Sequence, residues 1–111
     1  MSDIYAKYAP FFKALSDPNR LMIIDMLSCG ELCACEILKK FNITQPTLSH
    51  HMNILCECKL VNGRKNGKWT YYSLNNETVR NFRAFLEKIT TEKQECICNE
   101  HENVCDGECE C

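Results

Sequence analysis

The chain has 111 residues, of which 45% are hydrophobic and 25% charged, a composition typical of a single globular domain. It has no apolar run of about 18 residues that could span a membrane. The N-terminal segment lacks the basic and apolar regions of a signal peptide, so we expect a cytoplasmic protein with no membrane partner.

The net charge of −2 conceals a difference between the two ends of the chain. Residues 92–111 carry seven acidic side chains and one lysine, a net charge of −6. Residues 1–91 carry eight acids and twelve bases, a net charge of +4, and a mildly basic body suits nucleic-acid binding. We therefore expect a folded domain over 1–91 and a flexible, acidic, cysteine-rich tail over 92–111.

Ten of the 111 residues are cysteine. In a secreted protein this density would indicate a disulfide framework. In the reducing cytosol it instead favours metal or redox ligands, because thiols there stay reduced.

The first two helices are predicted from the spacing of their apolar residues and from residues typical of helix ends. Residues 3–15 predict a helix with an apolar face, in which Pro10 either causes a kink or delays the start. Asp17 as N-cap and Pro18 at the first helical position begin a second helix that runs to about residue 28. Gly30 ends it.

Two further helices follow at short spacing. They are expected over about 33–41 and 45–58, with a turn at 42–43 and Thr44 as the N-cap of the second. Two helices joined by three or four residues have the spacing of a helix-turn-helix.

A β-hairpin and a last helix complete the domain. Residues 60–64 and 69–74 are strand-like, and Asn66-Gly67 between them is a strong turn signal. Residues 76–90 return to helical spacing. One face of this helix is apolar: Val79, Phe82, Leu86 and Ile89. The expected fold class is mainly α with a minor β part, a winged helix-turn-helix of about five helices with a two-stranded β-hairpin wing.

The second helix of a helix-turn-helix enters the major groove, and residues near its N-terminus reach the bases. Here the corresponding side chains can hydrogen-bond to base edges and phosphates. They are Gln45, Thr47, Ser49 and His50. The expected partner is double-stranded operator DNA.

The wing adds positive charge beside this helix. The segment from Lys59 to Trp69 contains four bases and no acid, which suits contact with phosphates or the minor groove. The expected DNA-contacting residues of the wing are Arg64, Lys65 and Lys68.

The chain resembles the ArsR/SmtB family of metal-sensing repressors over about residues 10–90. The resemblance rests on four segments in this order: A-L-S-D-P-N-R-L, E-L-C-A-C-E-I-L, Q-P-T-L-S-H-H-M and R-K-N-G-K-W-T-Y-Y-S-L. The E-L-C-x-C element is most similar to arsenic- and cadmium-responsive members. The resemblance implies a homodimer with the first and last helices at its interface, so that residues 1–91 form a DNA-binding and dimerisation domain. It also implies a repressor that leaves its operator when inducer binds.

The zinc-responsive branch of that family has carboxylate and histidine ligands on the last helix, and residues 75–90 lack this pattern. Cys33 and Cys35 are instead the expected fixed pair of thiolate ligands, and thiolates select soft ions. The expected inducer is As(III) or Sb(III), with Cd(II), Pb(II) or Zn(II) as alternatives, and no organic cofactor is expected. Where the arsenic-type motif of the family often has a third cysteine, this chain has Leu38.

The third ligand has three candidate sources. Cys29 could fold back across the Gly30 turn, and the pair Cys56 and Cys58 follows the recognition helix. The tail also offers thiols: Cys96, Cys98, Cys105, Cys109 and Cys111.

The spacing of Cys33 and Cys35 constrains how they could act together. Residues at i and i+2 point to different sides of a regular helix. One ion can therefore bind both only if the first turn unwinds on binding or is not helical at this position.

The function expected from these features is a metalloid-sensing repressor that dissociates from operator DNA when arsenite or antimonite binds cysteine thiolates. Three alternatives remain open: a cadmium- or lead-sensing repressor, a thiol-redox repressor of the same fold, and a metal-binding carrier. An enzyme is not expected, because no nucleophile, base and orienting group form a recognisable set.

Overall fold

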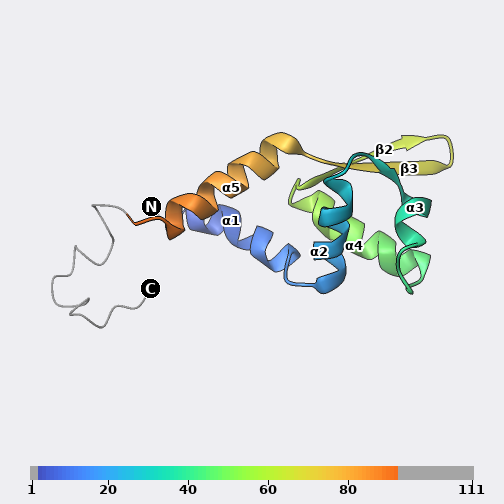
Figure 1. Cartoon of the computed structure of the whole chain (residues 1–111), viewed down its shortest axis with the longest axis horizontal. Coiled ribbons are helices and arrows are strands. Elements are labelled where there is room, and N and C mark those ends of the chain that lie inside the picture. The colour runs from blue at the N-terminus through green and yellow to red at the C-terminus, as the bar shows by residue number, and fades with distance from the viewer. Residues whose placement is uncertain (1–2, 93–111) are drawn as a thin grey trace.

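The computed structural model describes residues 3–92 (Figure 1). In chain order its elements are α1 (Asp3–Ala14), α2 (Pro18–Leu27), β1 (Leu32–Cys33), α3 (Ala34–Leu38), α4 (Gln45–Glu57), β2 (Val61–Asn66), β3 (Trp69–Leu74) and α5 (Asn76–Thr90). The predicted winged helix-turn-helix with five helices is confirmed. The tail expected over 92–111 lies outside the described residues except for its first residue, so Cys96, Cys98 and Cys105 do too.

Capping side chains begin α2 and α4 where the sequence predicts. The Asp17 carboxylate accepts hydrogen bonds from the backbone N–H groups of Asn19 (2.9 Å) and Arg20 (3.2 Å). Thr44 Oγ1 accepts from the N–H of Thr47 at 3.3 Å. Each cap satisfies helix N–H groups that have no partner within the helix, which fixes where the helix begins.

The sheet has three antiparallel strands in the order β1-β3-β2, which corrects the expected two-stranded wing. In the added strand, Leu32 pairs with Tyr72 and Cys33 pairs with Tyr71. Because Cys33 has an extended backbone (φ −76°, ψ 147°), α3 begins only at Ala34.

The third helix is also shorter than the predicted 33–41. After Leu38 the chain forms tight turns, in which the N–H of Lys40 bonds to the carbonyl of Ile37 (3.0 Å) and that of Phe41 to Leu38 (3.1 Å). Bonds of this i to i−3 type replace the α-helical ladder. The helix that supports α4 is therefore a short segment fixed at its start to the sheet.

The hairpin loop lies one residue later than the predicted Asn66-Gly67 turn. Asn66 still pairs with Trp69, so the loop consists of Gly67 and Lys68. Gly67 has φ +70°, a left-handed conformation that costs glycine little. The shift places Lys68 at the tip of the wing.

The core lies where α2, α3, α4 and the start of the wing meet. Its fully buried side chains are Ile23, Ile37, Leu48, Met52 and Leu55. They come from three helices, so the core holds the two helices of the helix-turn-helix to α2 and to each other.

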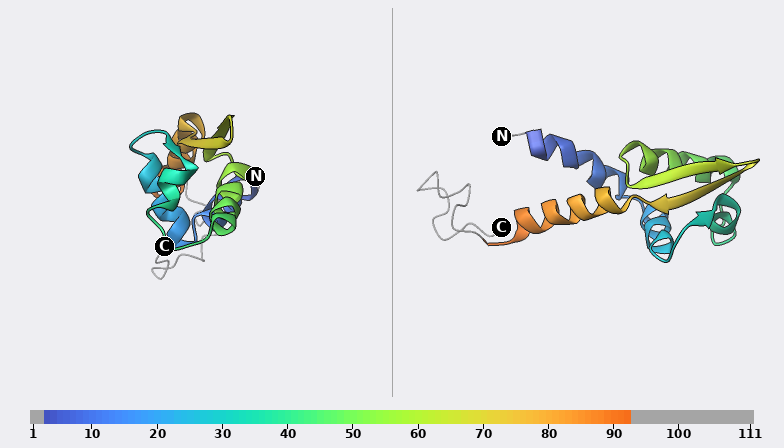
Figure 2. Two further views of the ribbon diagram at one scale, coloured as in Figure 1. Left: turned by 90° about the vertical axis from the view of Figure 1, so that its right-hand side faces the viewer. Right: turned by 90° about the horizontal axis from the view of Figure 1, so that it is seen from above.

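Helices α1 and α5 extend away from this body as a pair (Figures 1 and 2). They are joined by stacked rings, with centroids 4.4 Å apart for Tyr8 and Phe85 and 5.1 Å apart for Phe11 and Phe82. Pro10 lies inside α1, which begins at Asp3, so the proline does not delay the start of the helix.

The helix pair leaves apolar side chains in contact with solvent. Of the predicted apolar face of α5, Phe82 packs against α1, whereas Leu86 and Ile89 are exposed. The exposed set on both helices is Ile4, Tyr5, Phe12, Leu86 and Ile89. Clustered exposed apolar side chains are typical of protein–protein contacts. None of the helices within residues 3–92 is long and apolar enough to cross a membrane.

The substitution Leu55→Ala should destabilise the fold by about 2–5 kcal/mol, because it opens a cavity at a side chain with no solvent exposure. The free energy of unfolding is measured by urea denaturation at fixed protein concentration. Leu21→Ala, at a side chain that is 52% exposed, is the control and should change stability by less than about 0.5 kcal/mol. Equal effects of both substitutions would contradict the assigned core.

Candidate nucleic-acid interface and thiol site

The outer face of α4 presents the side chains that the sequence predicts for base recognition. Gln45, Thr47, Ser49 and His50 are all exposed. The opposite face is buried in the core through Leu48, Met52 and Leu55. The hydroxyl of Thr47 lies 2.9 Å from that of Thr44, so this side chain also contributes to the helix start.

A buried histidine fixes α4 to α2, a role that the sequence does not reveal. His51 is only 8% exposed, and its Nδ1 lies 3.0 Å from Nη1 of Arg20. Because arginine only donates, Nδ1 must accept, and the ring proton of the neutral form is on Nε2. Nε2 lies 4.0 Å from the carboxylate of Asp17, while Arg20 Nε donates to the carbonyl of Ala14. These contacts connect the recognition helix to the start of α2 and the end of α1.

The wing bases are exposed, but they differ in their partners. Arg64 donates two hydrogen bonds of 2.8 Å to the carboxylate of Glu31, and its guanidinium lies 4.8 Å from the centre of the Tyr71 ring. The hydrogen bonding by Arg64 lowers the pKa of the Glu31 carboxyl. A phosphate that binds Arg64 must therefore compete with Glu31 for the same donors.

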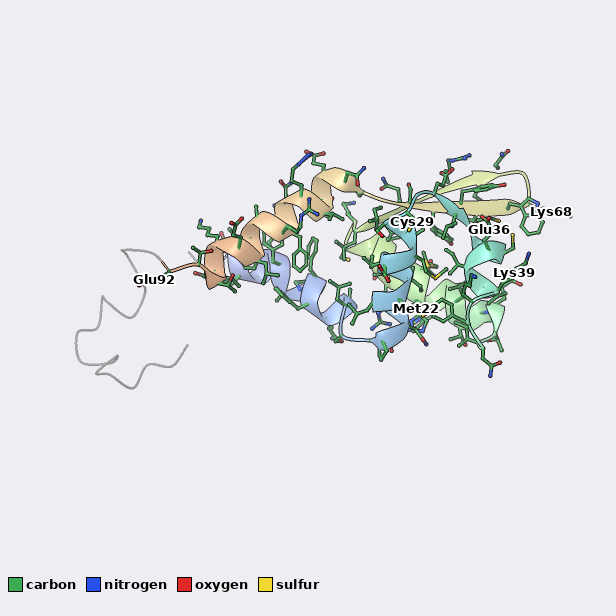
Figure 3. The ribbon with its side chains drawn as sticks, viewed as in Figure 1. Met22, Cys29, Glu36, Lys39, Lys68 and Glu92 are labelled. Atoms are coloured by element: carbon green, nitrogen blue, oxygen red, sulfur yellow. The ribbon has the colours of Figure 1, made fainter. Side chains whose placement is uncertain are left out.

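Lys65 and Lys68 are the other two wing residues predicted to contact DNA. Lys68 lies at the tip of the wing, at the same end of the molecule as Lys39, the C-cap of α3 (Figure 3). Its Nζ is 5.6 Å from the centre of the Trp69 ring. The basic tip of the wing thus adjoins the end of the body at which α3 lies.

The structure brings Cys33 and Cys35 together. The thiol of Cys35 donates to the sulfur of Cys33 at 3.0 Å, and Cys33 is buried while Cys35 is half-buried. Cys33 precedes the helix as its N-cap, and its N–H donates to the Glu36 carboxylate at 2.8 Å. Of the two alternatives expected from their spacing, the non-helical one holds, because pairing with β3 keeps Cys33 extended.

The surroundings of Cys35 favour its neutral thiol. The hydrogen bond to Cys33 is the main cause that raises the pKa of Cys35, followed by desolvation. The charges of Cys33 and Glu36 raise it further, whereas that of Lys39 lowers it. Cys35 therefore lacks the electropositive surroundings typical of a redox-reactive cysteine.

The other described cysteines lie apart from this pair. Cys29, labelled in Figure 3, is exposed at the end of α2, where it lines a separate hollow with Gly30 and Ser73. Cys56 and Cys58 are half-buried at the end of α4, and burial is the main cause that raises the pKa of each. Within residues 3–92, no three side chains of Cys, His, Asp or Glu are placed to hold a metal ion together.

A cavity of about 200 Å³ lies between α3, α4 and the wing. Cys35 lines it from α3, Gln45 and Ser49 line it from α4, and Lys68 and Trp69 line it from the wing. One thiol of the pair therefore faces the same hollow as two candidate base-reading side chains.

Comparison with known proteins assigns the chain to a family. Residues 17–63 match the family described as bacterial regulatory protein, arsR family. Over 105 residues the chain is 48% identical to the arsenical resistance operon repressor of Staphylococcus xylosus, covering 95% of this chain and 98% of that protein. The chain belongs to the arsR family of bacterial regulatory proteins.

Two further comparisons agree with this membership. The arsenical resistance operon repressor of Staphylococcus aureus is 45% identical, covering 95% of this chain and 98% of that protein. The solved structure of an ArsR-like transcriptional regulator from Rhodococcus sp. RHA1 has a TM-score of 0.69 and 28% identity, covering 78% of this chain and 82% of that one. The predicted family, fold class and regulatory rather than enzymatic nature of the arsR-family chain are confirmed.

In this arsR-family protein, Cys33→Ala should speed alkylation of Cys35 by iodoacetamide at pH 7–8. The substitution removes the sulfur whose hydrogen bond raises the pKa of Cys35, so more thiolate forms at a given pH. Peptide-resolved mass spectrometry measures the alkylation rate against pH, and its midpoint should move to lower pH.

Cys56 in the same samples is the internal control, because its pKa is raised mainly by its own burial. Its pH profile should not change. If the midpoint for Cys35 does not change, the hydrogen bond to the Cys33 sulfur does not raise the pKa of Cys35, and the prediction is wrong.

Proposed function

We propose that this protein is a homodimeric transcriptional repressor that binds operator DNA in the cytoplasm and leaves it when arsenite or antimonite binds Cys33 and Cys35. The observation that carries the proposal is the 3.0 Å contact of the two sulfurs where α3 meets the sheet of the wing. The names of the two staphylococcal relatives, both arsenical resistance operon repressors, support the choice of arsenic.

Base recognition is assigned to the exposed face of α4. Gln45, Ser49 and His50 supply donors and acceptors for base edges, and Thr47 lies in the first turn of the helix. The wing bases Arg64, Lys65 and Lys68 bind phosphates, which supplies affinity rather than sequence preference. The Arg20–His51 hydrogen bond keeps α4 in a fixed position on α2 while it reads DNA.

Dimerisation is assigned to α1 and α5. Their exposed apolar side chains would be covered by the same surface of a second chain, as a two-fold interface requires. A dimer presents two copies of α4 to half-sites about 34 Å apart, one turn of DNA. Operator affinity then depends on the position of each α4 relative to its partner.

Release follows from the position of Cys33 in two elements at once. As part of β1 it pairs with Tyr71 of the wing, and as N-cap it begins α3, which precedes α4. Holding both sulfurs on one trivalent arsenic atom fixes this junction and shifts the wing relative to α4. Inducer and DNA then weaken each other's binding by the same factor, with a coupling of about 1–3 kcal/mol in typical cases.

The chemistry of the donor set fits a soft trivalent ion. Each of the two thiols forms a bond to arsenic as one arsenic–oxygen bond of arsenous acid breaks, and the thiol proton leaves with that hydroxyl group as water. No nitrogen ligand is needed. The third sulfur is assigned to a cysteine of the tail, since Cys29 lines a different hollow and Cys56 and Cys58 lie at the far end of α4.

Titration of fully reduced protein on labelled operator DNA with arsenite should release the DNA at near-stoichiometric amounts. Cys33→Ser should abolish release without loss of DNA affinity, because the thiol is not part of the DNA-reading face. Fluorescence anisotropy of the DNA measures both. Cys29→Ser, at an exposed cysteine outside the pair, is the matched control and should respond like the native protein.

Three outcomes would contradict the proposal. Release by cadmium alone would identify a cadmium- or lead-type sensor. Release by peroxide alone would identify a thiol-redox repressor. A response that persists in Cys33→Ser but is lost on deletion of residues 92–111 would place the ligand site in the tail.

Lys65→Ala should weaken operator and non-specific DNA equally and reduce the salt dependence of binding. The slope of log K against log salt should fall by about 0.9 for each phosphate that the variant no longer neutralises, and a dimer carries two copies of Lys65. Anisotropy at several salt concentrations measures the slope. Lys13→Ala, at an exposed lysine of α1, is the charge-matched control and should leave the slope unchanged. Loss of sequence preference in Lys65→Ala would refute a phosphate contact.

A further inference from the structure

We infer that the cavity between α3, α4 and the wing holds the sugar-phosphate backbone of one DNA strand, and that the ring of Trp69 packs on a deoxyribose there. The inference rests on the proposed function, because its ligand is the same DNA. It goes further in assigning a ligand to the cavity and a DNA contact to Trp69, the only tryptophan of the chain.

The cavity lies where one strand of the DNA has to pass. A helix in the major groove and a hairpin in the next minor groove are separated by one sugar-phosphate backbone. The start of α4 and the tip of the wing lie at the same end of the body (Figure 1). Gln45 and Ser49 line the cavity from α4, and residues 68–70 line it from the wing. The backbone that separates the two grooves therefore meets this cavity.

The charge of the lining suits a phosphate. The cavity opens to solvent, and its lining contains one base, Lys68, and no acid. Each of four other hollows on the described part of the chain has at least one glutamate in its lining. A carboxylate beside a bound phosphate would repel it. The cavity beside the wing is free of this repulsion, unlike those four hollows.

The polar groups of the cavity are available to a ligand. Within residues 3–92, the side chains of Gln45, Ser49 and Thr70 make no hydrogen bond. Arg64, by contrast, already donates to Glu31. The Thr70 hydroxyl can bind a phosphate beside Lys68, and hydroxyl groups are common phosphate ligands in DNA complexes. Gln45 and Ser49 on the opposite wall remain available to the base edges of the same nucleotides.

Trp69 combines apolar surface with a neighbouring positive charge. Its side chain is 45% exposed, and Nζ of Lys68 lies 5.6 Å from the centre of its ring. A nucleotide has the complementary pair of features, because an anionic phosphate is joined to a sugar with apolar C–H groups. A lysine on the phosphate and a ring on the sugar use both features at once.

The proposed dimer leaves Trp69 uncovered. The exposed apolar side chains of α1 and α5 lie at the opposite end of the molecule from the wing (Figures 1 and 2). Contact with water is unfavourable for a large apolar ring, and DNA bound at the wing removes that contact. Since sugars and phosphates are the same in every sequence, the contact raises affinity for all duplex DNA and adds no sequence preference.

The first test measures access to the Trp69 ring in full-length, reduced protein. One probe is a duplex of about 30 base pairs, three helical turns, selected by the protein from a random-sequence pool, and the other is an unselected duplex of equal length. Acrylamide quenching of tryptophan emission reports this ring alone, because the chain has no other tryptophan. Saturation with either duplex should reduce the quenching. Unchanged quenching in both complexes would overturn the inference.

Trp69→Ala should weaken binding to both duplexes by about tenfold, because a dimer loses two rings packed on sugars. Trp69→Phe keeps an aromatic ring and should retain most of the affinity. Met22→Ala on α2, at an apolar side chain with a similar exposure of 43%, is the control and should bind like the native protein. Fluorescence anisotropy measures each affinity, and circular dichroism checks that each variant folds. Weaker binding to the selected duplex alone would mean that the ring reads bases, which contradicts a backbone contact.

Neutral phosphates locate the backbone in the cavity. Each phosphate of the selected duplex is replaced in turn by an uncharged methylphosphonate. At one position the native protein should lose affinity, whereas Lys68→Gln should lose none beyond its own defect. If no position behaves in this way, Lys68 does not bind a phosphate and the inference is wrong.

The same strand should cover Cys35, which lines the cavity from α3. The selected duplex should slow alkylation of Cys35 by uncharged iodoacetamide severalfold. Cys29 is the internal control, because it is exposed and lines a different hollow, and its rate should not change. Equal rates for Cys35 with and without DNA would contradict a backbone in the cavity.

The outcomes separate this inference from the proposed function. If arsenite releases the duplex through Cys33 but DNA leaves Trp69 accessible, only the further inference fails. If DNA covers Trp69 and Cys35 but arsenite does not release it, the inference holds and the proposed response to arsenite fails. If neither duplex binds, both fail.

Discussion

The pairing of Leu32 and Cys33 with Tyr72 and Tyr71 is the interaction on which the thiol site depends. These two residues add a short strand to the wing, and they hold Cys33 in an extended conformation just before α3. In a helix that continued through Cys33, the two sulfurs would point to different sides. The same ladder joins the thiol pair to the wing, so one local interaction both builds the site and connects it to the proposed DNA-binding surface.

The recognition helix is held very differently on its two sides. Towards α2 it is fixed by a fully packed core and by the buried contact of His51 with Arg20. Towards the tip of the wing it borders a cavity of about 200 Å³. Because packed interfaces resist small displacements and a cavity does not, α4 is held less tightly towards the tip of the wing than towards α2. The Glu31–Arg64 ion pair joins the segment before β1 to β2 on the exposed surface.

The parts of the fold that sequence reasoning predicts are those specified by neighbouring residues. Asp17 and Thr44 begin their helices through hydrogen bonds to groups two or three residues away, and the sequence predicts both positions. The strand β1 depends on pairing with β3, far along the chain, and two residues carry too little periodicity to indicate a strand. The same separation hides the partners of His51 and Arg64. Thus the choice of Cys33 and Cys35 follows from composition and resemblance, but their contact does not.

The thiol pair lies close to the proposed base-reading side chains of α4. Allosteric coupling between distant sites needs an element with two arrangements that both ligands bias. Here Cys35 lines the same cavity as Gln45 and Ser49, so the proposed inducer site and two of the proposed base-reading side chains border one hollow within one subunit. In the dimer that we propose, a small change in the position of α4 relative to the wing acts at both half-sites at once.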